Sequence, residues 1–456
     1  MSSIRETLRN ESGSTLVVVC IFALVMLITS LALVELGAQD AALATRDINA
    51  SQAFYNAEAG VERGMAWITA QGTLPSATVR PFGSTPEPYG GGLSMVAVTP
   101  AMAGARTIYK IQSYATLDGR SRAIQAVVTP SAFTDYLYYT NQDVGPASPG
   151  YFRTGDVIDG PIHVNDVLAV WGNPEFLSRV QTTSTELLYY NNGVPTFSSA
   201  LSNPPYDYPV FHEGMQTGVA PFPWLDQSDL NILKGVAGLS LSNVDLVFGR
   251  DPGTGPMLGY VSYAKNGTTA WTDVLLSSFN GVIYVGGTCR VWGTVDGQAT
   301  VVSNAQIQII DDLIVADSDA NGPRPGCDDI IGLVSSAMSV IIDNVPNNSD
   351  CVVHAHMMCM NNTSSLVQDY STGTPRGTLT IYGGLAQDKW GPVGTGYYDI
   401  DGNFHVLTGY DRDFHYDWRL RTMLPPGYEY IVFKGSNLDR LTWREITPID
   451  LYQWTG

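Results

Sequence analysis

The stretch STLVVVCIFALVMLITSLALV, which spans Ser14–Val34, decides the fold of this chain. It carries no charged residue, and together with Ser12 and Gly13 it is an uncharged run of roughly 20 residues or slightly more. A helix of about that length crosses the ~30 Å hydrocarbon core of a bilayer. Because a helix satisfies its backbone hydrogen bonds internally, it is stable in lipid. The stretch therefore predicts one membrane-spanning helix.

The residues that flank the apolar stretch predict its orientation. Arg5 and Arg9 precede it, mixed with two glutamates, and the acidic Glu35 follows it. Basic residues favour the cytoplasmic side of a membrane. We therefore expect the N terminus to lie inside and everything from Glu35 onward to be exported.

The helical pattern continues beyond the apolar stretch. No proline occurs from Leu36 to Ile68, and Gly72 and Pro75 then supply a stop. One helical face of this segment is apolar and consists of Phe54, Val61, Met65 and Ile68. We therefore expect one long helix, apolar all round in its first half and amphipathic in its second. A plain signal peptide would have no reason to continue in this way.

Two pieces of this helix carry a resemblance to a known family. Gly13–Val19 (GSTLVVV) and Gln52–Glu62 (QAFYNAEAGVE) resemble the N terminus of PilX-type minor pilins, which are subunits of type IV pili and related to the pseudopilins of type II secretion. The resemblance implies that a prepilin peptidase cuts after Gly13 and that Ser14 becomes a methylated N terminus. It also implies a leader of residues 1–13 and a pilin-like helix of residues 14–70.

One position departs from the pilin pattern. Most pilins carry a glutamate at the fifth mature position, and Val18 occupies it here. The family's pattern then implies a tip-type or accessory subunit instead of a major pilin. The expected partners are other pilin-like subunits, through the helix, together with the membrane and the peptidase. The expected location is the bacterial inner membrane, with an exported C-terminal region, and later the pilus or cell surface. A static single-pass anchor that is never processed is the alternative.

The composition limits the classes of function. The chain has 456 residues, enough for more than one domain, with a net charge of −19 and only 15% charged residues. Because phosphate binding needs clustered Lys and Arg, nucleic acid is not an expected partner. Disulfides can persist in an exported region. The cysteines there allow three complete pairings, and they are Cys289, Cys327, Cys351 and Cys359.

Residues 71–130 predict a small antiparallel β unit. The expected strands are Gly92–Val98, Thr107–Ala115 and Arg122–Thr129, with a turn at Leu117–Arg120 between the last two. A sheet of this kind needs an apolar cover. We expect the amphipathic half of the helix to supply it.

Residues 131–456 predict a larger β-rich domain, which makes the expected fold α+β or mainly β. Apolar residues alternate with polar or small ones across Gly281–Ala316, and similar apolar pairs recur every ~18 residues. This regularity favours a β-solenoid of the right-handed β-helix kind, in which each coil is buried against its neighbours. A β-sandwich is the alternative, and one short helix is expected at Trp224–Leu233.

Pieces of the same region resemble an uncharacterised bacterial domain often found behind PilX-type N termini. They are Gly160–Asp166, Asn173–Phe176, Asp328–Val334, Gly377–Gly384 and Gly409–Leu420. No reaction can be transferred from that domain, so the resemblance implies an exported, pilus-associated role and nothing beyond it.

A candidate calcium loop is formed by Asp317, Asp319, Asn321 and Asp328. Acidic or amide side chains at alternate positions, followed by Gly322 for a sharp turn, are typical of calcium loops. Asp328 replaces the usual closing glutamate and is shorter by one methylene. The loop predicts calcium as the one cofactor, and a solvated acidic loop between strands is the alternative.

Several histidines lie near acids or cysteines. In CVVHAHMMC, from Cys351 to Cys359, a straight strand would place the two histidines and the two cysteines on opposite faces, so packed histidines are favoured over a zinc site. Two further groups could suggest acid–base chemistry. The first is His163 with Asp159, Asn165 and Asp166, and the second is His405 and His415 with Asp411, Asp413 and Asp417.

The sequence predicts a structural protein. No Ser-centred elbow, phosphate loop or paired CxxC motif occurs in it, and we expect no catalytic residues. The expected function is that of a minor pilin-like or pilus-associated subunit whose β-rich domain serves adhesion or primes assembly. The alternative is a membrane-anchored β-helix that binds or cleaves envelope polysaccharide.

Overall fold

The structure is a computed structural model with two compact units. It describes residues 3–71, 75–103, 106–142, 150–222, 224–336, 340–343, 349–360, 366–399, 404–431 and 438–448, with the backbone alone for residues 3–14, 439 and 440. The first unit comprises Met1–Pro100, Tyr109–Val128 and Arg440–Gly456, and the second comprises Ala101–Ile108 and Thr129–Asp439. The side chains of the expected processing residues Gly13 and Ser14 lie outside the described part.

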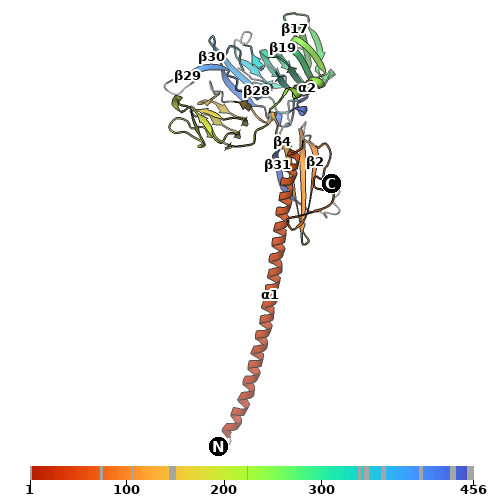
Figure 1. Cartoon of the computed structure of the whole chain (residues 1–456), viewed down its shortest axis with the longest axis vertical. Coiled ribbons are helices and arrows are strands. Elements are labelled where there is room, and N and C mark those ends of the chain that lie inside the picture. Colours follow the sequence, from red (N-terminus) through yellow and green to blue (C-terminus); the bar gives the residue numbers. More distant parts are fainter. Residues whose placement is uncertain are drawn as a thin grey trace. The chain divides into compact units, whose positions relative to one another are not determined.

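The first unit begins with the long helix that the sequence predicts. Helix α1 spans Ser3–Thr69, and its length and apolar character are enough to cross a membrane (Figure 1). Its most apolar window of 18 residues has a mean hydropathy of 3.0 and is fully exposed. The long N-terminal apolar helix followed by a mostly β region is therefore confirmed.

The second half of α1 packs on a five-stranded sheet. The strands are, in spatial order, β1 (Glu87–Tyr89), β2 (Gly92–Ala103), β3 (Arg106–Leu117), β4 (Arg120–Pro130) and β31 (Leu438–Ile446). Strands β2, β3 and β4 contain most or all of the three ranges expected from the sequence. Strands β3 and β4 join through Asp118 and Gly119, whose φ angles of 46° and 72° are those of a tight hairpin turn.

Small residues form the centre of the contact between α1 and the sheet. Ala53, Ala57 and Val61 are fully buried, whereas the expected contact residues Phe54 and Met65 are half-buried at the margin. A Cβ atom at Gly60 would overlap Ser113, and one at Gly64 would lie 2.8 Å from Ile111. The helix approaches the sheet more closely than large side chains would allow. Of the expected face, Val61 and Ile68 are buried, whereas alanine and glycine take the central positions.

This close approach predicts the effect of a large side chain at Gly60. Gly60→Leu should destabilise the first unit by roughly 1–3 kcal/mol, because the buried contact is overpacked. Gly37→Leu is the matched control, since nothing lies within 4 Å of a Cβ atom at Gly37. Hydrogen exchange of β3 in detergent-solubilised protein measures the loss. Equal protection of β3 in the two variants would show that the helix does not need glycine there.

The second unit is built on a large sheet that closes on itself and is mainly parallel. One parallel ladder passes, in spatial order, through β16 (Leu239–Phe248), β19 (Val282–Val295), β20 (Gln298–Ser303), β24 (Ile330–Ser335), β27 (His356–Cys359), β28 (Pro375–Lys389), β5 (Tyr138–Gln142), β8 (Ile162–Val164), β11 (Val180–Thr182) and β15 (Met215–Gln216). Strand β5, which comes early in the chain, thus pairs with β28, which comes late. Figure 1 shows blue β28 and β30 between the green and yellow parts of the unit.

The long strands of this sheet take part in more than one ladder. In β19, Ile283 pairs with Val301 of β20, whereas Val291 pairs with Ile309 of β21 (Ile307–Val315). Gly287, with φ 99°, lies between the two parts. Further ladders join β21 to β25 (Val340–Ile342) and β26 (Cys351–Val353), and β26 through β28 to β30 (Phe404–Tyr416). These pairings are parallel, whereas a β-sandwich pairs its strands antiparallel.

The inward-facing side chains of these ladders form the main core. The alternating residues expected from the sequence are all buried, and all of them except Val315 belong to this core, among them Ile283, Val291, Val301 and Ile309. A second core lies on the other face of the first ladder. There Leu230 and Leu233 of α2 (Gln227–Val236) pack with side chains that include Tyr284, Val302 and Met358. Helix α2 lies three residues later than expected, because Asp226 caps its start and accepts from Ser228 N.

Antiparallel pairs also occur in the second unit. Strands β17 (Tyr260–Lys265) and β18 (Thr272–Leu275) extend β16 at one end. A separate four-stranded sheet contains β13 (Thr196–Ser198), paired antiparallel with β12 (Leu187–Tyr189), and continues in parallel through β9 (Ala169–Trp171) and β6 (Phe152–Arg153). A three-stranded parallel sheet contains β14 (Val210–Phe211), β10 (Glu175–Phe176) and β7 (Val157–Ile158). In the loop between β21 and β24, β22 (Ser318–Asp319) pairs antiparallel with β23 (Gly322–Pro323).

The division of the chain differs from the expected domains in one respect. The sequence suggests a single domain from residue 131 to the C terminus, but β31 pairs with β4 and belongs to the sheet of the first unit. The larger segment of the second unit, Thr129–Asp439, therefore lies in the chain between two neighbouring strands of the first. Pairing between strands this far apart in sequence leaves no local signal, which is why the pattern of residues does not reveal it.

Candidate functional site

A row of polar and aromatic side chains follows the outer face of the parallel sheet. Tyr382 of β28 pairs in register with His415 of β30, while their neighbours Ile381 and Phe414 point into the core. The Tyr382 and His415 rings are stacked, with centroids 4.7 Å apart, and His354 meets Tyr382 edge-on at 5.3 Å. The parallel register thus places side chains from three separate segments in one line.

His415 lies between two carboxylates. Its Nδ1 is 2.7 Å from Asp159 Oδ2, and its Nε2 is 2.9 Å from Asp413 Oδ1. Hydrogen bonding to Asp159, followed by the charges of both acids, raises the pKa of His415 above its ordinary value although burial opposes this. The sequence assigns Asp159 and His415 to two separate groups, and the structure brings these two residues together.

The remaining members of the two groups are dispersed. His163 is buried and bonded to Asn165 at 2.9 Å, its ring is stacked on Tyr139, and burial lowers its pKa. Asp166 accepts from Thr182 Oγ1 through its main-chain oxygen. His405 pairs with Asp399 at 2.7 Å in the exposed part of the β29–β30 hairpin, where β29 spans Gly394–Tyr398. These contacts are those of packed or surface-paired side chains.

The two other acids of the second group each have an arginine partner. Asp411 lies 3.6 Å from Arg153, and Asp417 lies 2.7 Å from Arg419. No acid–base group is assembled from them, because each carboxylate already faces a guanidinium.

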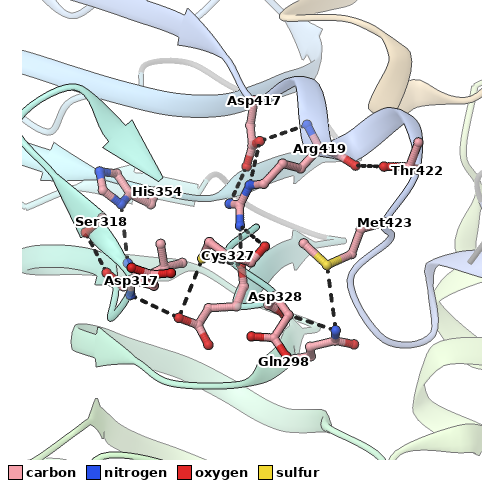
Figure 2. A network of polar contacts seen from close by, with 12 residues as sticks. Gln298, Asp317, Ser318, Cys327, Asp328, His354, Asp417, Arg419, Thr422 and Met423 are labelled. Atoms are coloured by element: carbon pink, nitrogen blue, oxygen red, sulfur yellow. Dashed lines mark hydrogen bonds and ion pairs between the residues drawn. The ribbon is translucent and has the colours of Figure 1, made fainter. Parts of the chain in front are cut away.

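A network of buried polar contacts closes the loop between β21 and β24. Asp329 is almost fully buried, and its carboxylate accepts from Gly297 N at 2.6 Å and from Asp317 N at 3.1 Å. Arg419 donates to the carbonyl oxygens of Cys327 at 3.1 Å and of Asp329 at 2.9 Å. Figure 2 shows the Arg419 side chain extended between Asp417 and Cys327. The network satisfies main-chain groups that the loop would otherwise leave buried without partners.

The candidate calcium residues have other partners in this structure. Asp317 and Asp319 each lie 3.5 Å from the Arg324 side chain. Asn321 N donates to Asp319 at 2.9 Å, which lowers the pKa of Asp319. Asp328 is exposed and accepts from Gln298 through its main-chain oxygen. Within the described ranges, no cluster of three or more His, Cys, Asp or Glu side chains could hold a metal ion. Calcium binding stays a prediction.

The sequence singles out Asp328 and misses its neighbour Asp329. Asp329 is the buried acid of the loop, and its carboxylate also accepts from Cys327 Sγ at 3.6 Å. The one available signal is position, since Asp329 directly precedes the buried strand that begins at Ile330.

Two of the cysteines and both nearby histidines are packed side chains. The segment from Cys351 to Cys359 is two strands instead of one, because β26 ends at Val353 and β27 begins at His356 in a different ladder. Burial lowers the pKa of His354 to about 4 and that of His356 to about 3. Cys351 and Cys359 are buried in the main core, and no disulfide joins any of the five cysteines, all of which lie among the described residues.

The loop network predicts unequal effects at two adjacent aspartates. Asp329→Ala should destabilise the second unit by about 1–3 kcal/mol, because two part-buried main-chain N–H groups lose their acceptor. Asp328→Ala should cost less than about 0.5 kcal/mol, as for an exposed side chain. Urea unfolding of the full chain, followed by hydrogen exchange of β24, measures both. Similar losses in the two variants would contradict the assigned role of Asp329.

Comparisons with known proteins add limited information. Residues 96–185 match a family model described as a domain of unknown function (DUF4900). Among solved structures, the competence-associated pilin ComZ from Thermus thermophilus is similar at 11% identity and a TM-score of 0.29, over 87% of this chain and 97% of ComZ. No curated protein matches the chain. The family model covers less than half of the chain and the superposition is loose, so the functional assignment rests on the residues themselves.

Proposed function

We propose that this chain is a minor pilin-like or pilus-associated structural protein, anchored in the inner membrane by α1. The observation that carries the proposal is the division of one continuous helix into two environments. Side chains from Thr15 to Ile48 are exposed and mostly apolar, whereas Ala53, Ala57 and Val61 are buried on the sheet of the first unit. The packed half contains the QAFYNAEAGVE piece that resembles PilX-type N termini. A removable signal peptide has no such packed continuation.

The polar side chains in the exposed half support a membrane location. Thr29 Oγ1 and Ser30 Oγ both donate to the main-chain oxygen of Met26, at 3.0 and 2.7 Å. Thr45 Oγ1 donates to Ala41 O at 2.8 Å. Hydroxyls bonded within their own helix need no water, so this surface suits lipid or the apolar faces of other subunits' helices. Val18 at the fifth mature position fits an accessory or tip-type subunit better than a major pilin.

In this proposal the second unit is the displayed part, and it is a β-solenoid. The support is the register of its ladders, in which the first and second parts of β19 pair in parallel with different strands, as do the first and second parts of β28. A rigid body of this kind, carried on a membrane helix, suits adhesion or the priming of assembly. The role is structural and involves no catalysis.

The proposal predicts prepilin-type processing. Intact mass and N-terminal sequencing of the protein from its native cells should give Ser14 as the first residue, with a methylated amine. Gly13→Leu should abolish cleavage and incorporation into filaments, whereas Gly37→Leu, a glycine beyond the cleavage site, should still be cleaved.

Other N termini would contradict the proposal in different ways. Met1 would identify an uncleaved anchor. A start between Ala38 and Ala44 would identify an ordinary secretory signal and a secreted β protein. Normal assembly of the Gly13→Leu variant would also overturn the pilin-like role.

A further inference from the structure

The parallel stack of the second unit contains a seam at which side chains take the place of strand pairing. We define the seam as the contact between residues 156–159, around β7, and residues 411–416 of β30. Strand β7 pairs with β10, and β30 pairs with β28 and β29. No backbone pairing between β7 and β30 is found among the described strands, although the adjacent ladder continues through the β28–β5 pairing.

One ion pair across the seam has an arginine as its basic partner. Arg412 Nη2 lies 2.9 and 2.7 Å from the two oxygens of Asp156, and both side chains are nearly buried. Asp156 also accepts from Arg153 N at 2.8 Å. Because a guanidinium does not lose its proton in a protein, deprotonation of the basic partner does not weaken this contact as the pH rises.

The second ion pair across the seam involves a group that titrates. Asp159 contacts His415 Nδ1 at 2.7 Å through one oxygen and accepts from Tyr416 N at 2.9 Å through the other. The second ring nitrogen of His415 is 2.9 Å from Asp413. Ionised carboxylates only accept hydrogen bonds, so both contacts require an N–H on each ring nitrogen. The imidazolium meets this requirement, and neutral imidazole has one N–H too few.

The surroundings of His415 contain no further charged group within the named contacts. Asp159 faces it from the segment after β7, Asp413 from its own strand, and the uncharged Tyr382 ring stacks on it from β28. Asp413 also accepts from Thr380 at 3.1 Å. When His415 loses its proton, the charge that attracts Asp159 across the seam is removed, and one of the two hydrogen bonds is lost.

We propose that His415 is a pH-sensitive lock between β7 and β30. The lock is closed while the imidazole is protonated and loosens when it becomes neutral, while Arg412 and Asp156 keep the two segments together. The raised pKa of His415 agrees with this geometry. Since the folded pKa lies above the ordinary value of 6.5, the stabilisation is fully present below pH 6.5 and is lost as the pH rises through the folded pKa.

Hydrogen exchange of the full-length protein between pH 5.5 and pH 9 tests this proposal, with rates corrected for the intrinsic pH dependence of exchange. Protection of peptides covering residues 154–162 and 404–416 should fall about two- to fivefold as the pH rises, the size expected for a half-exposed ion pair. Peptides of β19 should not change. His415→Gln and Asp159→Asn should show low protection of the seam peptides at every pH.

His405→Gln is the matched control. His405 lies on the same strand and has an aspartate at the same 2.7 Å distance, but that aspartate, Asp399, belongs to the β29–β30 hairpin and not to the seam. This variant should keep the full pH dependence at residues 154–162. A pH dependence that survives in His415→Gln, or that is lost in His405→Gln, would overturn the assignment.

A measurement on the unaltered protein covers the case in which His415→Gln fails to fold. An NMR titration of the histidine ring signals should give His415 a pKa above 6.5. Exchange at residues 154–162 should follow the same midpoint. A His415 pKa at or below 6.5, or a different midpoint for the exchange, would contradict the lock.

Discussion

The parallel pairing of β5 with β28 determines the arrangement of the second unit. Leu385 pairs with Tyr138 and Ala386 with Tyr139, so an early strand continues a sheet that late strands have built. The chain therefore starts in the middle of the stack, proceeds to one end at β15, and resumes at the opposite end at β16. Because backbone groups inside a sheet need partners on both sides, this junction has to be tight. The contact between β7 and β30 lies beside this junction, and there side chains instead of backbone hydrogen bonds join the early and late parts of the chain.

The acidic residues of this chain have a structural use besides solubility. In the loops between strands of the second unit, carboxylates accept hydrogen bonds from main-chain N–H groups that no strand reaches. Asp207 accepts from Gly172 N and Asn191 N, and Asp350 accepts from Thr378 N. Asp329 does the same for Gly297 and Asp317. Some of the acidic residues behind the net charge of −19 are thus needed as hydrogen-bond acceptors for main-chain N–H groups near the loops.

Patterns within short stretches of the sequence predicted individual helices and strands, but not how distant strands pair. Uncharged length predicted α1, and alternation across Gly281–Ala316 predicted buried strands, because inward positions in a strand repeat every second residue. The pairing of β31 with β4 and of β5 with β28 has no such signature. The same reason separates Asp159 from His415 in the sequence, since they are 256 residues apart and meet through a side-chain contact that no local pattern indicates. Asp328 and Asp329 differ by burial, which one sequence does not reveal.

The environment of α1 changes where the first sheet contacts begin. Asn49 donates to Asp118 at 3.1 Å, and Asn56 donates to the main-chain oxygens of Tyr89 and Gly90. On the N-terminal side of these contacts, large apolar side chains such as Leu33 and Val34 are 69% and 71% exposed. An exposed apolar surface of this extent is unfavourable in water and marks a membrane or protein interface. Since the described residues of the chain leave it uncovered, its cover has to come from lipid or from other helices. The apolar half of α1 therefore needs lipid or other helices around it, and this requirement is the physical basis of the proposed role.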